Sequence, residues 1–181
     1  ETHTHADHIT SAAALALRTG AVTCASEHGA ACAARHLRGG DGLALGTTAI
    51  RALATPGHTS DSLSFYADGQ VFTGDTLLVR GTGRTDFQNG DATALYESIT
   101  RKLFTLPGET LVWPGHDYHG HRVSSIAEER RYNPRLAGKS RDQFAVLMRE
   151  LRLAPPKLLW LAVPANLDCG RDTQEVAEKS C

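Results

Sequence analysis

The sequence predicts an α+β protein, because short strands fill one part of it and helices with clear periodicity fill others. Apolar or β-branched runs broken by turns occupy residues 42–73, a pattern typical of strands. Between residues 92 and 104, Leu95, Ile99 and Leu103 recur at intervals of four and therefore share one face of a helix. We expect one domain, since 181 residues can bury a sizeable core but do not comfortably make two domains.

The first 40 residues predict two short helices and a strand. An Ala- and Leu-rich helix is expected over residues 9–18, with His8 at its start and Gly20 as its stop. Residues 21–24 predict a short strand. Residues 27–37 predict a short helix that a pair of glycines closes.

Strands alternate with turns in the middle of the chain. They are expected at residues 43–45, 49–54, 62–66 and 70–73. The sequence Ala67-Asp68-Gly69 predicts the hairpin turn before the last of these strands. Asp75 therefore lies just past a strand end.

The second half of the chain predicts helices around one further strand, residues 110–113, which brings His116 to its carboxyl end. Helices are expected at residues 92–104, 124–131 and 141–151. The last carries an apolar stripe that we interpret as core packing. From about Cys169 onward the chain is polar, which predicts a C-terminal tail with frayed ends.

Composition argues against several classes of function. The formal net charge is −1, with no long run of either sign, which argues against nucleic-acid binding. No stretch reaches the roughly 18 to 20 apolar residues of a membrane helix, and no export signal is evident at the N-terminus. The four cysteines form no C-x-x-C pair and are too few for a disulfide scaffold, so we expect a reducing compartment.

Histidines and aspartates fall in a pattern typical of metal ligands. Four candidate ligands lie within six residues, namely His3, His5, Asp7 and His8. Three further candidates each follow a glycine at the end of a strand-like run, namely His58, Asp75 and His116. Glycine lets the backbone turn sharply, so that such side chains can reach inward beside one another. Any one of these residues alone would be an ordinary surface group, but the seven together predict a metal site.

These motifs resemble the metallo-β-lactamase superfamily, in which an H-x-H-x-D-H segment is followed by downstream His, Asp and His. Longer strings are similar to its persulfide dioxygenase (ethylmalonic encephalopathy protein-like) family. They are residues 2–10, 55–59, 72–78, 81–87, 116–120 and 163–166. The resemblance implies a four-layer αββα sandwich with the metal site at the edge between two sheets. Strands precede the H-x-H-x-D-H segment in that fold, so we expect residues 1–181 to be a single domain without its N-terminal strands.

The resemblance also implies one mononuclear Fe(II) centre per chain. Matched by position, its ligands are His3, His58 and Asp75. A site of two histidines and one carboxylate leaves adjacent positions open for a sulfur and for dioxygen. The residues that match ligands of a second metal in binuclear relatives are expected to orient these ligands and hold water. They are His5, Asp7, His8 and His116.

The implied reaction is the oxidation of glutathione persulfide by O2 and water to glutathione and sulfite. Tyr118 is a candidate hydrogen-bond donor to the substrate or the oxygen species, with a packed tyrosine as the equal alternative. Arg84 is expected to brace its loop through Asp86 rather than hold a glutathione carboxylate. Arg80 and Asn166 are weaker candidates for contacts with glutathione. Cys169 is expected to be a structural cysteine rather than an accessory thiol.

Three other functions remain open at this point. A zinc thioester hydrolase of the glyoxalase II type has the same seven ligands. A sulfur carrier would keep the site without turnover, and a nuclease is the weakest alternative because no basic stripe is present.

We expect bacterial cytoplasm, or the mitochondrial matrix for a eukaryotic chain. The expectation for partners leaves open a homodimer and a sulfurtransferase of the rhodanese type, and it includes neither nucleic acid nor a membrane.

Overall fold

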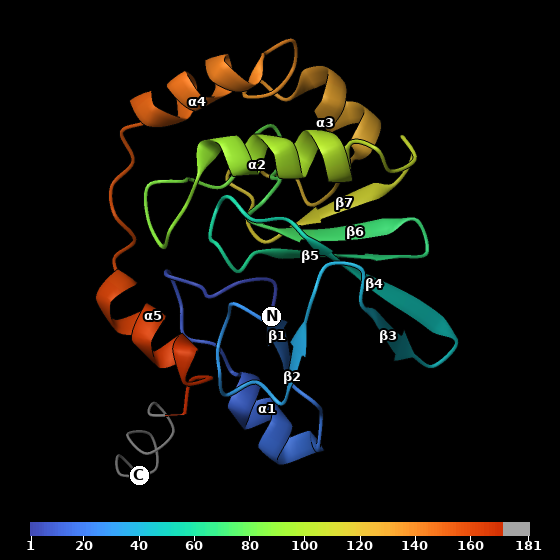
Figure 1. Cartoon of the computed structure of the whole chain (residues 1–181), viewed down its shortest axis with the longest axis vertical. Coiled ribbons are helices and arrows are strands. Elements are labelled where there is room, and N and C mark those ends of the chain that lie inside the picture. Colours follow the sequence, from blue (N-terminus) through green and yellow to red (C-terminus); the bar gives the residue numbers. More distant parts are fainter. Residues whose placement is uncertain (172–181) are drawn as a thin grey trace. The chain divides into compact units, whose positions relative to one another are not determined.

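The computed structural model describes residues 1–171 (Figure 1), and the chain divides into two compact units. One unit contains Glu1, His3–Leu37 and the described residues from Arg152 onward, and the other contains Thr2 and Arg38–Leu151. Most of the polar tail expected from about residue 169 lies outside the described residues. No helix of residues 1–171 is long and apolar enough to cross a membrane.

A six-stranded sheet organises the second unit, in the order β3-β4-β5-β6-β7-β8. Its strands are β3 (Gly42–Leu45), β4 (Thr48–Ala54), β5 (Leu63–Ala67), β6 (Gln70–Gly74), β7 (Leu111–Pro114) and β8 (Ser124–Ser125). All neighbours are antiparallel except β6 and β7, which are parallel. It follows that β4, β6 and β7 run in the same direction and end at the same edge of the sheet.

Local sequence signals account for the strands of this sheet. The expected hairpin turn between β5 and β6 is confirmed, with Asp68 and Gly69 at φ values of 46° and 73°. Positive φ at both central residues suits the right-handed twist of the flanking strands, and Asp-Gly adopts it readily. The four strands expected between residues 43 and 73 are present within a residue or two of their expected ends.

Helices α2 (Ala92–Ser98), α3 (Ile126–Tyr132) and α4 (Arg141–Glu150) lie together on one face of the sheet (Figure 1). The helix expected over residues 92–104 is confirmed, but it continues beyond α2 as a π-helical segment, Ile99–Leu103. Asp91 caps α2 by accepting from the Ala94 N–H, and Ser140 with Gln143 forms a capping box on α4. Side chains from the sheet and helices share one core, which includes Val71, Val112, Leu95, Ile99, Ile126 and Phe144.

The first unit departs from the sequence predictions. Helix α1 (Ala12–Thr19) ends at Gly20 as expected, with Gly20 at φ 72°. The helix expected over residues 27–37 is wrong, because residues 35–37 form strand β2 (Arg35–Leu37), parallel to β1 (Cys24–Ser26). The Glu27 N–H also donates to the Leu37 carbonyl (3.0 Å), so pairing between distant residues replaces the local helix. Helix α5 (Leu159–Leu167) was not predicted, and it contains Pro164, a residue that disfavours a helix interior.

The cysteines also differ from expectation. Cys32 and Cys169 form a disulfide, with sulfur atoms 1.98 Å apart, although 137 residues separate them in sequence. The sequence did not predict this pair, and a disulfide does not fit the expected reducing compartment. Cys169 has a structural role, as expected, but as half of a disulfide rather than as a buried thiol. Spacing along the chain carries no information about such a long-range pair.

Candidate metal centre

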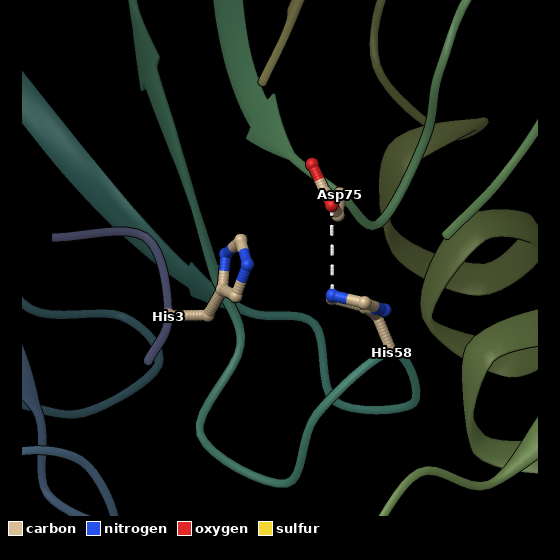
Figure 2. Close-up of side chains that lie close together, drawn as sticks. All are labelled: His3, His58 and Asp75. Atoms are coloured by element: carbon tan, nitrogen blue, oxygen red, sulfur yellow. Dashed lines mark ion pairs between the residues drawn. The ribbon is translucent and has the colours of Figure 1, made fainter. Parts of the chain in front are cut away.

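Three expected ligands of the second unit meet at one edge of its sheet. His58 lies four residues past the end of β4, Asp75 follows β6 directly, and His116 lies two residues past the end of β7. The Oδ2 atom of Asp75 lies 3.6 Å from Nε2 of His58 and 3.6 Å from Nε2 of His116. The facing atoms of His58 and Asp75 can be followed in Figure 2. The common direction of the three strands brings these residues together.

These distances fit metal ligands better than hydrogen bonds. A spacing of 3.6 Å between a ring nitrogen and a carboxylate oxygen exceeds hydrogen-bond length. Two atoms that each lie about 2.1 Å from one metal ion are typically about 3 to 3.5 Å apart. The second oxygen of Asp75, Oδ1, is buried and has no hydrogen-bond partner among the described residues. Because a buried carboxylate oxygen without a partner is costly, this donor set fits a bound cation.

A backbone carbonyl orients His58. The Nδ1 atom of its ring lies 2.8 Å from the carbonyl oxygen of Arg84. A carbonyl only accepts hydrogen bonds, so the geometry assigns the proton of the neutral ring to Nδ1. The Nε2 atom that faces Asp75 then carries the lone pair that a metal ion binds. Such a hydrogen bond on the far side of the ring is typical of metal-bound histidines.

Two glycines leave the space in which these groups meet. A Cβ atom on Gly83 would lie 2.3 Å from the Asp75 carbonyl oxygen and 2.7 Å from Nδ1 of His58. A Cβ atom on Gly115 would lie 2.7 Å from Oδ1 of Asp75. Sequence reasoning singled out Gly115 for its place before a ligand but assigned no role to Gly83. The only signal for Gly83 was its place in a glycine-rich loop shortly after Asp75.

A second group of candidate ligands lies in the first unit. The ligand atoms of His5, Asp7 and His8 all lie within 4.8 Å of one another. Nδ1 of His8 lies 3.1 Å from Asp7, and Nε2 of His5 lies 3.2 Å from the Glu1 carboxylate. That hydrogen bond from His5 is the main reason why the pKa of Glu1 is lowered to about 2. Three of the four candidate ligands of the H-x-H-x-D-H segment therefore lie together in this group.

The buried amide of Asn166 organises the same segment. Its Nδ2 donates to the carbonyl oxygens of His5 and His8, both at 2.8 Å. Its Oδ1 accepts from the Thr10 N–H at 2.8 Å, and the residue is 3% exposed. These contacts place Asn166 in the support of the histidine segment, a role that the sequence did not suggest.

The two arginines that were expected near the substrate pair with carboxylates. Arg84 makes a two-pronged contact with Asp86, Nε to Oδ1 at 2.6 Å and Nη2 to Oδ2 at 2.7 Å. This contact lowers the pKa of Asp86, and it is the bracing geometry expected for Arg84. Arg80 pairs with Glu128 and with Glu129, the latter at 2.6 Å.

Tyr118 lies beside His116, one of the candidate ligands. Its ring stacks on that of His116, with centroids 5.8 Å apart and planes 12° from parallel. The residue is 73% exposed, so it is not packed in the core, which was the alternative to a role as hydrogen-bond donor.

The six-stranded sheet, the helices on its face and the candidate ligands at its edge together define a metal-binding protein of the metallo-β-lactamase type. Residues 33–116 match the family model of the metallo-beta-lactamase superfamily. The human mitochondrial persulfide dioxygenase ETHE1 is 46% identical over 175 residues, which cover 95% of this chain and 68% of that protein. The chain belongs to the ETHE1 persulfide dioxygenase family of this superfamily.

Two further relatives bear on the fold and on the alternative function. The crystal structure of ETHE1 from Myxococcus xanthus is 59% identical, with a TM-score of 0.92 over 93% of this chain and 75% of that one. This similarity confirms the expected metallo-β-lactamase fold. A Burkholderia pseudomallei protein described as a probable metallo-hydrolase is 35% identical, over 94% of this chain and 71% of its own.

Proposed function

We propose that the chain is a persulfide dioxygenase that oxidises glutathione persulfide with O2 and water to glutathione and sulfite. The observation that carries the proposal is the 46% identity to human ETHE1, a named persulfide dioxygenase. The arrangement of His58, Asp75 and His116 at one sheet edge supports it, because this chemistry needs a metal ion with open positions.

The proposed iron ligands are His3, His58 and Asp75. His58 and Asp75 already face one another across 3.6 Å. The preceding residue, Thr2, belongs to the same unit as these two, because its carbonyl oxygen accepts the Leu63 N–H at 2.7 Å. His3 follows Thr2 directly in the chain, so the Cα atoms of the two residues are about 3.8 Å apart. Bound Fe(II) would supply the redox chemistry and the adjacent positions for sulfur and O2.

The other residues of the site orient ligands and substrate. His116 shares the Oδ2 atom of Asp75 with His58 and so restricts the carboxylate. Tyr118, stacked on His116, can direct its hydroxyl toward a persulfide or an oxygen species. Arg84 supplies the carbonyl that orients His58 while its guanidinium is engaged with Asp86. We assign His5, Asp7 and His8 a supporting role around the ligands.

Contacts with glutathione are most readily made by Tyr118. The guanidinium of Arg80 is engaged by two carboxylates, and the amide of Asn166 by three backbone groups. The side chain of Arg80 is 33% exposed, so only its edge is open to a contact with glutathione. Asn166 could act on glutathione only through the segment that it supports.

The zinc thioester hydrolase is the alternative, and the comparisons do not favour it. The hydrolase-named relative is 35% identical to this chain, against 46% for the human persulfide dioxygenase.

Bacterial cytoplasm belongs to our proposal, as do a homodimer and a rhodanese-type partner. The 59% identity to the Myxococcus xanthus protein supports a bacterial source, whereas the Cys32–Cys169 disulfide argues against a reducing compartment.

Oxygen consumption tests the proposal. Anaerobically iron-reconstituted protein is mixed with glutathione persulfide, beside a zinc-loaded sample and a His58→Ala variant. Uptake that requires both iron and His58 is the expected result. No uptake from a folded, iron-loaded sample would overturn the dioxygenase and favour the thioester hydrolase, which the zinc-loaded sample tests with a glutathione thioester.

A further inference from the structure

Three polar side chains on α3 and the turn after it hold the backbone of residues 80–82. Residues 80–84 are termed the metal loop, and Glu129, Asn133 and Arg135 the loop clamp. Oε2 of Glu129 accepts the Arg80 N–H at 2.9 Å. Nδ2 of Asn133 donates to the Gly81 carbonyl at 3.0 Å. Each clamp residue thus faces one successive residue of the loop, and Arg135 completes the series at Thr82.

Arg135 contacts both the backbone and the side chain of Thr82 in the metal loop. Its Nη1 donates to the Thr82 carbonyl oxygen at 2.7 Å and reaches Oγ1 of Thr82 at 3.2 Å. The same Oγ1 donates to the carbonyl of Gly83 at 3.1 Å. Thr82 is 3% exposed, so these bonds are shielded from water and are strengthened by the low local dielectric.

The clamp is a closed network rather than a set of separate contacts. Glu129 is fully buried, and its carboxylate also accepts from Arg80 Nη1 at 2.6 Å, Ser124 Oγ at 2.6 Å and Asn133 Nδ2 at 2.9 Å. Asn133 is fully buried as well. Satisfied polar networks in the interior hold a segment in one geometry. None of the clamp residues belongs to the set of expected ligands or substrate contacts.

The metal loop leads directly to the acceptor of His58. The Gly83 N–H donates to the Asp75 carbonyl at 2.7 Å, and the next carbonyl, that of Arg84, lies 2.8 Å from Nδ1 of His58. The clamp therefore acts on the backbone two to four residues before the atom that orients the ligand.

We propose that Glu129, Asn133 and Arg135 are positioning residues for the metal centre. They hold the metal loop so that the Arg84 carbonyl accepts the Nδ1–H of His58, which puts the lone pair of the neutral ring on Nε2, the atom that faces Asp75. This inference rests on the proposed role of His58 as a ligand. It adds that the tautomer of His58 is set by residues of α3 and the turn after it, through backbone atoms, before any metal binds.

The test measures the tautomer in metal-free protein. Long-range 15N NMR on histidine-labelled protein, at a pH where the rings are neutral, reports which nitrogen carries the proton. The signal of His58 is assigned by its loss in His58→Gln. We expect the Nδ1–H form in the wild type and a mixture with the Nε2–H form in Arg135→Met. Co(II) titration should show a dissociation constant about tenfold higher in that variant.

Two variants separate positioning from general stability. Arg135→Lys keeps a donor and should recover much of the wild-type tautomer and Co(II) affinity. Arg130→Met is the matched control, because Arg130, which lies on α3, likewise donates to a backbone carbonyl, that of Phe104 at 3.2 Å, outside the metal loop. It should change neither measurement, even if its melting temperature falls as much as that of Arg135→Met.

Two results would overturn the inference: a wild type without the Nδ1–H form, or a folded Arg135→Met with wild-type tautomer and Co(II) affinity. If Arg135→Met does not fold, Thr82→Val takes its place, since it removes Oγ1 without changing side-chain volume much. A smaller shift in the same direction is expected there, and no shift would contradict the proposal. Neither measurement involves O2 or persulfide, so failure of the proposed activity leaves this test intact.

Discussion

The imidazole of His58 and the backbone carbonyl of Arg84 are joined by a hydrogen bond of 2.8 Å between Nδ1 and oxygen. Because the acceptor is a main-chain atom, its position depends on the path of the loop rather than on the side chain at position 84. Substitutions that displace this loop should therefore affect the metal centre even when they leave every ligand in place.

Gly83→Ala should disrupt the centre. Its Cβ would lie 2.3 Å from the Asp75 carbonyl oxygen and 2.7 Å from Nδ1 of His58, so backbone and ring must both move. We expect a loss of about 1 to 3 kcal/mol in the free energy of unfolding, as in other overpacked sites, and a metal content well below one per chain. Thermal unfolding and metal analysis measure the two effects.

Gly81→Ala is the matched control for that change. A Cβ on Gly81 would meet nothing closer than 3.8 Å, and it lies in the same loop. Metal content near the wild-type value is expected. Equal loss of metal in both variants would contradict the steric explanation.

Asp75→Asn should separate metal binding from stability. Without metal, Oδ1 of Asp75 is a buried oxygen with no partner among the described residues, so removal of the charge should leave the metal-free protein as stable as the wild type or more so. With metal at about 100 times its dissociation constant, only the wild type should gain about 2.7 kcal/mol. Melting curves with and without metal test this. A metal-dependent gain in Asp75→Asn would show that Asp75 is not a ligand.

The Arg84–Asp86 pair predicts a pH dependence. The hydrogen bonds from Arg84 lower the pKa of Asp86 below its ordinary value of about 3.9. A carboxyl group with a lowered pKa stabilises the folded state above that ordinary value and loses its effect as the pH falls through the folded value. The side chain of Asp86 is 52% exposed, so the effect should be below about 1 kcal/mol. Asp86→Asn should thus be less stable than wild type at pH 7, and the difference should shrink as the pH falls below about 3.9. A difference that grows toward acid would contradict the assignment.

Reduction of the Cys32–Cys169 disulfide should destabilise the protein by about 2 to 4 kcal/mol, because the bond restricts the unfolded chain across 137 residues. Cys32→Ser should lower the melting temperature similarly and make it insensitive to reductant. Cys24, a free cysteine, offers Cys24→Ser as the control, which should melt like the wild type and respond to reductant. Thiol titration should find two more reactive groups after reduction, and an unchanged number would show that the disulfide is absent.

Tyr118→Phe should slow turnover by about tenfold without a change in melting temperature. The hydroxyl is the group assigned to the substrate or oxygen species, and a residue that is 73% exposed contributes little to the core. Oxygen uptake over a range of persulfide concentrations would separate kcat from KM. Tyr132→Phe, at a residue that is 50% exposed and outside the ligand set, should match the wild type. Unchanged kcat and KM in Tyr118→Phe would remove Tyr118 from the mechanism.

Much of the second unit could be predicted because its signals are local. Asp68-Gly69 specifies a hairpin turn by its tolerance of positive φ, and the period of Leu95, Ile99 and Leu103 specifies a helical face. The pattern did not predict that the end of this helix, Ile99–Leu103, is π-helical. The three candidate ligands of this unit could also be chosen from the sequence, since each follows a glycine after a strand-like run. They are His58, Asp75 and His116.

Long-range partners could not be predicted in the first unit. Residues 27–37 have an Ala-rich composition that suits a helix, yet β2 pairs with β1 and the Cys32–Cys169 bond joins distant segments. Nothing in the spacing of these residues indicates which segment each will meet. Tertiary pairing therefore overrode the local preference.

The sequence by itself determined most strands and helices of the second unit, the candidate ligands and the family, but it placed Ser124 and Ser125 in a helix where the structure has strand β8. Only the tertiary structure decided that Asp75 lies 3.6 Å from both His58 and His116, and that the carbonyl of Arg84 orients His58. The reason is physical. Helical periodicity and turn conformation depend on residues that are close along the chain, so they are visible in the types of residue present. A backbone carbonyl is the same at every position, so its role as a partner becomes visible only when the fold places it.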